Sequence, residues 1–196
     1  MDEYKRVTIE QIEAGLVGEP LRMNRIMSLA LVMGTTLFLA VVLYIYQKNL
    51  SSDIEISYNA VDELIVVFLI LALIIYPTFL IFPKIFLKGN KLEAKLLSST
   101  LSLNNISTTD PVINIISLDR TMMIIRLAML EGVALFGLVA LMLCVNSGLI
   151  YHNDNYWLLV IPLFIQAIAT SSFVSKEKII SRIERDILFR IKTENY

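Results

Sequence analysis

The chain has 196 residues, of which 56% are hydrophobic and only 18% are charged, and its formal net charge at pH 7 is −1. Soluble domains are nearer a quarter charged, and the apolar residues here come in long blocks, which indicates a polytopic membrane protein. No basic patch is interleaved with aromatic residues, so we expect no nucleic-acid partner.

Residues 1–25 form the predicted cytoplasmic N-terminal segment. Its first 20 residues carry five acidic side chains and lack the apolar core of a signal peptide. Thr8 and Gln11 have the spacing of a capping box, in which each side chain bonds the backbone of the other residue. The pattern predicts a short amphipathic helix over residues 8–15 that ends near Gly18.

Four apolar stretches follow, each close to the ~20 residues that a helix needs to cross ~30 Å of hydrocarbon. Pro77 and Pro83 lie late in the second stretch, where they predict a kink or an early end. We therefore predict an all-α fold with a four-helix membrane domain over residues 26–174. Its spans cover residues 26–46, 64–86, 122–145 and 156–174, and a cytoplasmic loop over residues 87–121 joins the second to the third.

The positions of Lys and Arg predict the orientation of the chain. Sixteen of the 17 lie in the N-terminal segment, in the middle loop with its edges, or in the tail, and Lys48 alone lies in the other two loops. The positive-inside rule then predicts a multi-pass protein of the bacterial cytoplasmic (inner) membrane with both termini in the cytoplasm. The opposite interface would carry an aromatic belt of Tyr44, Tyr46, Tyr151, Tyr156 and Trp157.

Residues 175–196 form a basic, amphipathic tail that we expect to be helical. Ile179, Ile183, Ile187 and Ile191 recur every four residues and give one apolar stripe. The tail either continues the fourth span out of the membrane or lies along its inner surface. Packing of the stripe on the middle loop and binding of a partner are equally compatible with this pattern.

The first and third spans resemble each other. Residues 29–43 and 127–141 are identical at seven of 15 positions, and both spans start from the cytoplasmic side. This similarity predicts a tandem-duplicated helical hairpin, that is, a parallel internal repeat. Met33 occupies the position equivalent to Glu131, so one carboxylate serves two hairpins.

Small residues recur at matched positions of the two related spans. Ala30 and Gly34 in the first span correspond to Ala128 and Gly132 in the third. A small-xxx-small pattern lets helix backbones approach closely. We therefore expect the first and third spans to form the tightly packed centre, with the second and fourth outside.

Glu131 lies within the third span, where a carboxylate costs about 3 kcal/mol on insertion scales. Thr35, Thr78, Gln166 and Thr170 are expected at similar depths, so these polar groups should meet. In one interpretation Glu131 is neutral and buried, and it holds helices together through a hydrogen bond to Gln166 or to a threonine. In a second, Glu131, Gln166, Thr78 and Thr170 form an ion- or proton-binding set. In a third, Glu131 recognises a cationic ligand or a Lys or Arg of a partner helix.

No catalytic constellation is visible. Ser171 and Ser172 have no histidine in their span, and none of the hydrolase or phosphate-binding motifs occurs. Cys144 is the only cysteine and His152 the only histidine, which excludes an intrachain disulfide and a Cys/His metal site. We expect a protein that is not an enzyme and that carries no metal or cofactor.

Residues 126–139 read Arg-Leu-Ala-Met-Leu-Glu-Gly-Val-Ala-Leu-Phe-Gly-Leu-Val, and residues 175–179 read Ser-Lys-Glu-Lys-Ile. This pair of segments resembles an uncharacterised family of small four-span bacterial membrane proteins, whose third helix carries a similar Ala-Leu-Leu-Glu-Gly-x-Ala-Leu-Phe block. The resemblance implies a four-span fold.

The third span also resembles the ion-carrying helix of the proteolipid (c) subunits of rotary ATPases. The matching positions are Ala128, Glu131, Ala134, Gly137, Val139 and Asn146. This resemblance implies that Glu131 is an ion-binding carboxylate.

Two functions remain open at this point. The first is a non-enzymatic subunit or assembly component of a membrane complex, with Glu131 as interhelical glue. The second is a proton- or cation-binding, proteolipid-like element of an ion-translocating machine. The partners expected besides the lipid bilayer are other membrane subunits or a second copy, docked on the second and fourth spans or on the Ile179–Ile191 stripe.

Overall fold

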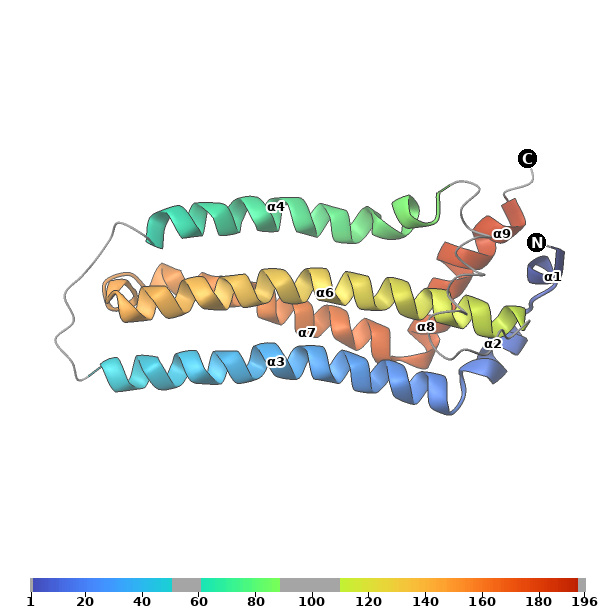
Figure 1. The fold of residues 1–196 in the computed structure, drawn as a ribbon, viewed down its shortest axis with the longest axis horizontal. Helices are drawn as coiled ribbons and strands as arrows, with labels where there is room; N and C mark the ends of the chain where they lie inside the picture. Colours follow the sequence, from blue (N-terminus) through green and yellow to red (C-terminus); the bar gives the residue numbers. More distant parts are fainter. Residues whose placement is uncertain (1, 51–60, 89–109, 194–196) are drawn as a thin grey trace. The chain divides into compact units, whose positions relative to one another are not determined.

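The computed structural model describes residues 2–50, 61–88 and 110–193, and the regular elements in these ranges are helical. Four helices are long and apolar enough to cross a membrane, which confirms the predicted all-α fold with four candidate spans. They are α3 (Glu19–Asn49), α4 (Val61–Phe86), α6 (Pro111–Asn146) and a fourth helix, Asp154–Val174, that joins the 3-10 helix η2 (Asp154–Val160) to α7 (Ile161–Val174) (Figure 1).

Short helices occupy both ends of the described chain. The predicted N-terminal helix is α2 (Ile9–Leu16), and its capping box is present, with the Gln11 amide donating to Thr8 Oγ1 and the Thr8 amide to Gln11 Oε1. Gly18 follows with a φ of +93°, a conformation that favours glycine. The remaining short elements are α1 (Asp2–Lys5), η1 (Leu149–Tyr151), α8 (Lys176–Ile183), the π-helix η3 (Glu184–Leu188) and α9 (Phe189–Thr193).

The third span is longer than predicted. Helix α6 starts at Pro111, so the last part of the expected loop 87–121 is helical. Asp110 caps this start, because its Oδ1 accepts a hydrogen bond from the Val112 amide at 2.9 Å, and proline is favoured in the first turn of a helix. The early turns are buried at Ile115 and Leu118, so packing stabilises helix where the sequence suggested a link.

The second span does not end early at its prolines. Helix α4 is continuous through Pro77 and Pro83 to Phe86. The Thr78 hydroxyl donates to the Ile74 carbonyl at 2.7 Å.

The chain forms two compact units, which differ from the predicted division into residues 1–25, 26–174 and 175–196. The first unit comprises Met1–Ser28, Ile81–Arg126 and Ser171–Tyr196. The second comprises Leu29–Leu80 and Leu127–Thr170. The N-terminal segment and the tail therefore belong to one unit, together with the start of α6.

The core of the first unit contains the isoleucine stripe of the tail. Ile179, Ile183, Ile187 and Ile191 are each at most 1% exposed and pack with residues of α2 and α6. The tail is thus helical as predicted, but a separate helix, because Ser175 has an extended backbone and α8 begins at Lys176. The expectation that a partner docks on this stripe is wrong, since the chain itself covers it.

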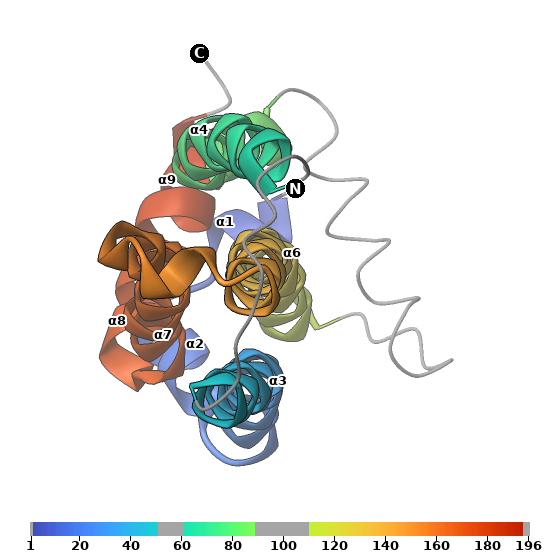
Figure 2. The same ribbon diagram turned by 90° about the vertical axis from the view of Figure 1, so that its left-hand side faces the viewer.

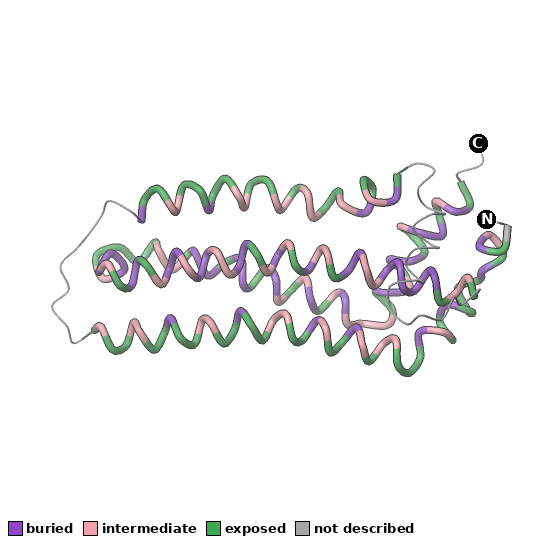
Figure 3. The backbone as a smooth tube through the Cα atoms, viewed as in Figure 1, coloured by how far each residue is buried: buried purple, intermediate pink, exposed green. Residues whose placement is uncertain are grey.

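Helices α6 and α7 lie at the centre of the second unit. Both views place α3 and α4 on opposite sides of this pair (Figures 1 and 2). In the most apolar 18-residue stretch of each helix, 50% of the residues are buried in α6, 39% in the fourth helix, 17% in α3 and 6% in α4. The prediction of a centre built from the first and third spans is therefore wrong for the first, and exposed positions prevail along α3 and α4 (Figure 3).

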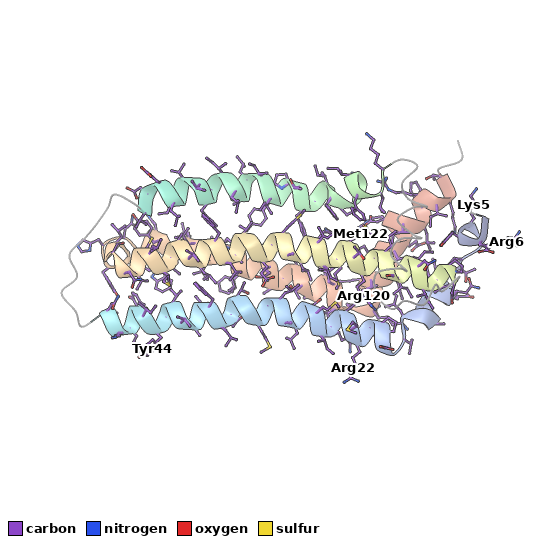
Figure 4. All side chains as sticks on the ribbon, in the orientation of Figure 1. Lys5, Arg6, Arg22, Tyr44, Arg120 and Met122 are labelled. Carbon is purple, nitrogen blue, oxygen red and sulfur yellow. The ribbon has the colours of Figure 1, made fainter. Side chains whose placement is uncertain are left out.

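Three of the five predicted belt aromatics, Tyr46, Tyr151 and Trp157, pack against one another within the second unit. The ring of Tyr46 stacks on that of Tyr151 with centroids 5.2 Å apart and meets the Trp157 ring edge-on at 5.3 Å. The Tyr151 hydroxyl donates to the Tyr46 carbonyl at 2.9 Å. Tyr44 is 68% exposed and points away from the other helices (Figure 4).

Candidate functional site

The carboxylate of Glu131 lies against the backbone of a neighbouring helix. Helix α6 carries Glu131, and a Cβ atom placed on Gly34 of α3 would lie 3.6 Å from its Oε1. The side chain is half-buried rather than fully buried as expected. Within the part of the chain that the structure describes, no hydrogen bond or ion pair reaches this carboxylate.

The predicted partner of Glu131 is engaged elsewhere. Gln166 on α7 accepts a hydrogen bond from Thr35 Oγ1 at 3.1 Å and donates from Nε2 to the Leu31 carbonyl at 3.3 Å. Gln166 and Thr35 are both completely buried. The polar layer therefore forms in part, but it joins α7 to α3, and the expected bond between Glu131 and Gln166 is not made.

The two other threonines of the predicted ion-binding set donate within their own helices. Thr78 Oγ1 donates to the Ile74 carbonyl and Thr170 Oγ1 donates to the Gln166 carbonyl, both at 2.7 Å. Hydroxyls that bond the carbonyl four residues earlier are common in membrane helices. The structure thus does not bring the donors of Thr78 and Thr170 to Glu131.

The four small residues expected at a helix contact are exposed instead. Ala30, Gly34, Ala128 and Gly132 all lie on accessible surface, and nothing lies within 4 Å of a Cβ placed on Gly132. These four positions are accessible within the described chain, and their role in helix packing stays a prediction. Glu131 is consequently flanked by small, open positions on both α3 and α6.

Gly137 is the glycine of α6 at which helices meet closely. A Cβ placed there would lie 2.7 Å from the Leu159 carbonyl oxygen and 3.1 Å from the Phe68 ring. The sequence comparison missed this residue because the matching position of the first span is Leu39, so the repeat drew attention to Gly132 instead. The fourth helix, through Leu159, and α4, through Phe68, reach α6 at Gly137.

A second polar cluster, which the sequence did not predict, lies in the first unit. Arg182 binds both carboxylate oxygens of Asp119, from Nε at 2.8 Å and from Nη2 at 2.6 Å, and both residues are buried. Two guanidinium groups lie over the Phe173 ring, that of Arg182 at 4.6 Å and that of Arg126 at 5.3 Å from its centroid. Such cation–π contacts stabilise arginines that are removed from water.

Two buried asparagines, Asn24 and Asn114, take part in further hydrogen bonds between the start of α6 and the N-terminal segment. Arg120, labelled in Figure 4, donates from Nε to Asn24 Oδ1 at 2.9 Å. Asn114 Nδ2 donates to the Tyr4 hydroxyl at 2.8 Å. These contacts fix the start of α6 to α1 and α3 within the first unit, which is a structural task.

The chemistry available at Glu131 is that of one carboxylate. Among the described residues, no group of three or more His, Cys, Asp or Glu side chains is arranged to hold a metal ion. What the site offers is a hydrogen-bonding or proton-binding group on an accessible helix surface, with no side chain larger than alanine at four adjoining positions.

No protein-family model, curated protein or solved structure matches this chain.

Proposed function

We propose that this membrane-embedded protein is a non-enzymatic subunit or assembly component of a membrane complex, and that Glu131 bonds a helix of its neighbour. One observation carries the proposal. The Glu131 carboxylate is accessible on a candidate span, beside Gly34, and has no partner in the described ranges.

The energetics favour a partner from outside the chain. A carboxyl group left in hydrocarbon without a partner costs about 3 kcal/mol, and a donor on a second helix recovers part of this cost. Ala30, Ala128 and Gly132 leave room for a backbone to approach on either side of Glu131. The neighbour is another membrane subunit or a second copy of this chain.

The charge bias of the chain supports a setting in the bacterial cytoplasmic membrane with both termini in the cytoplasm. The similarity of residues 29–43 to 127–141 supports descent from a duplicated hairpin, and residues 126–139 support kinship with small four-span bacterial membrane proteins. This membrane setting and this ancestry are both compatible with a non-enzymatic subunit.

Photo-crosslinking inside cells tests the subunit proposal. A photoreactive residue at position 128, next to Glu131, should form an adduct with one discrete protein, and Glu131→Ala should reduce that adduct strongly. The matched probe at Leu73, which is 75% exposed on α4, should label lipid only. Identical labelling at both positions, unaffected by Glu131→Ala, contradicts the proposal.

The second candidate function is proton or cation binding at the same carboxylate. The accessibility of Glu131 and the likeness of its helix to the ion-carrying helix of proteolipid subunits favour it. A carboxylate-reactive carbodiimide separates the two functions. Labelling of Glu131 that Na⁺ or high pH suppresses supports ion binding, whereas a carboxyl sealed against a neighbouring helix stays unlabelled in the assembled complex.

A further inference from the structure

A pocket lies within the first unit, where the tail helices meet the end of α4. Its volume is about 820 Å³, within the usual range of ligand pockets. Pro83 and Lys84, in the last turns of α4, form one wall, and residues of η3 and α9 form another. Because α4 is a candidate span that ends at Phe86, the pocket adjoins a terminus of a membrane-spanning helix.

The pocket is rich in cations. Lys84, Arg185, Arg190 and Lys192 line it, against the two acids Glu184 and Asp186. Across the described ranges, neither Lys84 nor Lys192 takes part in an ion pair, and both are exposed. Their ammonium groups are therefore available to an anion.

Arg185 is held in place beside these lysines. Its Nε and Nη2 donate to the two carboxylate oxygens of Asp186 at 2.8 and 3.2 Å. The hydrogen bonds from Arg185 to Asp186 raise the pKa of Arg185, so its guanidinium stays protonated. The excess positive charge of the pocket therefore comes from Lys84, Arg190 and Lys192.

Besides the charged residues, the lining contains four apolar residues, Ile9, Pro83, Leu188 and Phe189, and two hydroxyl residues, Ser181 and Thr193. Phe189 is 64% exposed, and Leu188 and Pro83 adjoin it in the wall of the pocket. Arg185, Asp186 and Leu188 belong to η3, a π-helix. A π-helical turn inserted among α-helical ones changes the direction of its side chains and is frequent at functional sites.

We propose that this pocket binds the phosphate head group of an anionic phospholipid. Lys84 and Lys192 contact the phosphate oxygens, and Phe189 packs against the glycerol and the start of the acyl chains. A free phosphate offers the same charge but makes no use of the apolar wall. The end of a span is also the depth at which head groups lie, and basic pockets at this depth recognise anionic lipids.

The test is a lipid titration of the full chain in neutral detergent, followed by native mass spectrometry. Phosphatidylglycerol should bind more tightly than phosphatidylcholine with the same chains and more tightly than glycerol phosphate, its soluble head group. In the double variant Lys84→Gln/Lys192→Gln, the dissociation constant for phosphatidylglycerol should rise by about tenfold or more.

Lys88→Gln/Lys178→Gln is the matched control, because it removes two exposed lysines that do not line the pocket. Its dissociation constant should change much less. Equal losses in the two double variants overturn the proposal, because they indicate general surface attraction. Equal affinity for phosphatidylcholine overturns it as well, and so does equal affinity for glycerol phosphate, which indicates a site for a soluble phosphate.

Discussion

Arg182 of α8 donates two hydrogen bonds, of 2.8 and 2.6 Å, to the carboxylate of Asp119 on α6, and the two side chains are 9% and 1% exposed, respectively. This buried ion pair joins the tail to the third span within the first unit. The Phe173 ring covers the guanidinium group at 4.6 Å. The tail is therefore an integral part of the fold.

Replacing Arg182 alone should destabilise the protein severely. Arg182→Met leaves the Asp119 carboxylate buried without its partner, and we expect the free energy of unfolding in detergent to fall by about 3–5 kcal/mol. Asp119→Leu/Arg182→Met should lose less than the single change, because no charge is stranded. Arg185→Met, at a side chain that is 71% exposed, should cost about 1 kcal/mol at most. Equal losses for Arg182→Met and Arg185→Met would count against the burial argument.

The two glycines of α6 that follow Glu131 should respond oppositely to alanine. Gly137→Ala places a Cβ 2.7 Å from the Leu159 carbonyl oxygen, and we expect a loss of about 1–3 kcal/mol from overpacking. Gly132→Ala meets nothing within 4 Å and should be neutral, or stabilising by up to about 1 kcal/mol through helix propensity. Thermal unfolding of both variants in the same detergent checks this, and the reverse order would be incompatible with the packing described.

Adjacent threonines of α3 provide a second matched pair. Thr35→Val removes the hydrogen bond to Gln166 and should cost about 1 kcal/mol, as polar contacts between membrane helices do. Thr36 is exposed and bonds only the Val32 carbonyl of its own helix, so Thr36→Val should change stability little. Denaturant titration distinguishes the two, and a larger effect at Thr36 argues against the α3–α7 polar contact.

Cysteine accessibility tests the orientation inferred from charge. Cys144 is completely buried and can be replaced by serine to give a background without cysteine. A membrane-impermeant maleimide added to intact spheroplasts should label His152→Cys at once, because this position lies in the predicted outer loop. Lys88→Cys, in the predicted cytoplasmic loop, should react only after permeabilisation. The opposite pattern reverses the topology.

Signals between residues near one another in the sequence were sufficient to predict most of the helices. Each apolar block long enough to span a bilayer is a helix, because a backbone in hydrocarbon must satisfy its hydrogen bonds within the segment. Thr8 and Gln11 also identified the start of α2 correctly, because a capping box involves only neighbouring residues. Asp110 and Pro111 carry the same kind of signal for α6, but they fall within the predicted loop 87–121.

Contacts between distant residues needed the tertiary structure. The isoleucine stripe of the tail would have the same spacing whether it faced a partner, a membrane or the core of its own chain. Only the tertiary structure shows that it is buried in the core. Similarly, small residues show that another helix can pack closely, and polar residues within a span show that a hydrogen bond can form. Neither feature shows which residue lies opposite. The rotation of each helix about its axis decides that Gln166 meets Thr35, that Gly137 meets Leu159, and that Glu131 remains accessible beside Gly34. Sequence periodicity sets which residues share a helix face, and packing of all the helices together sets where that face points.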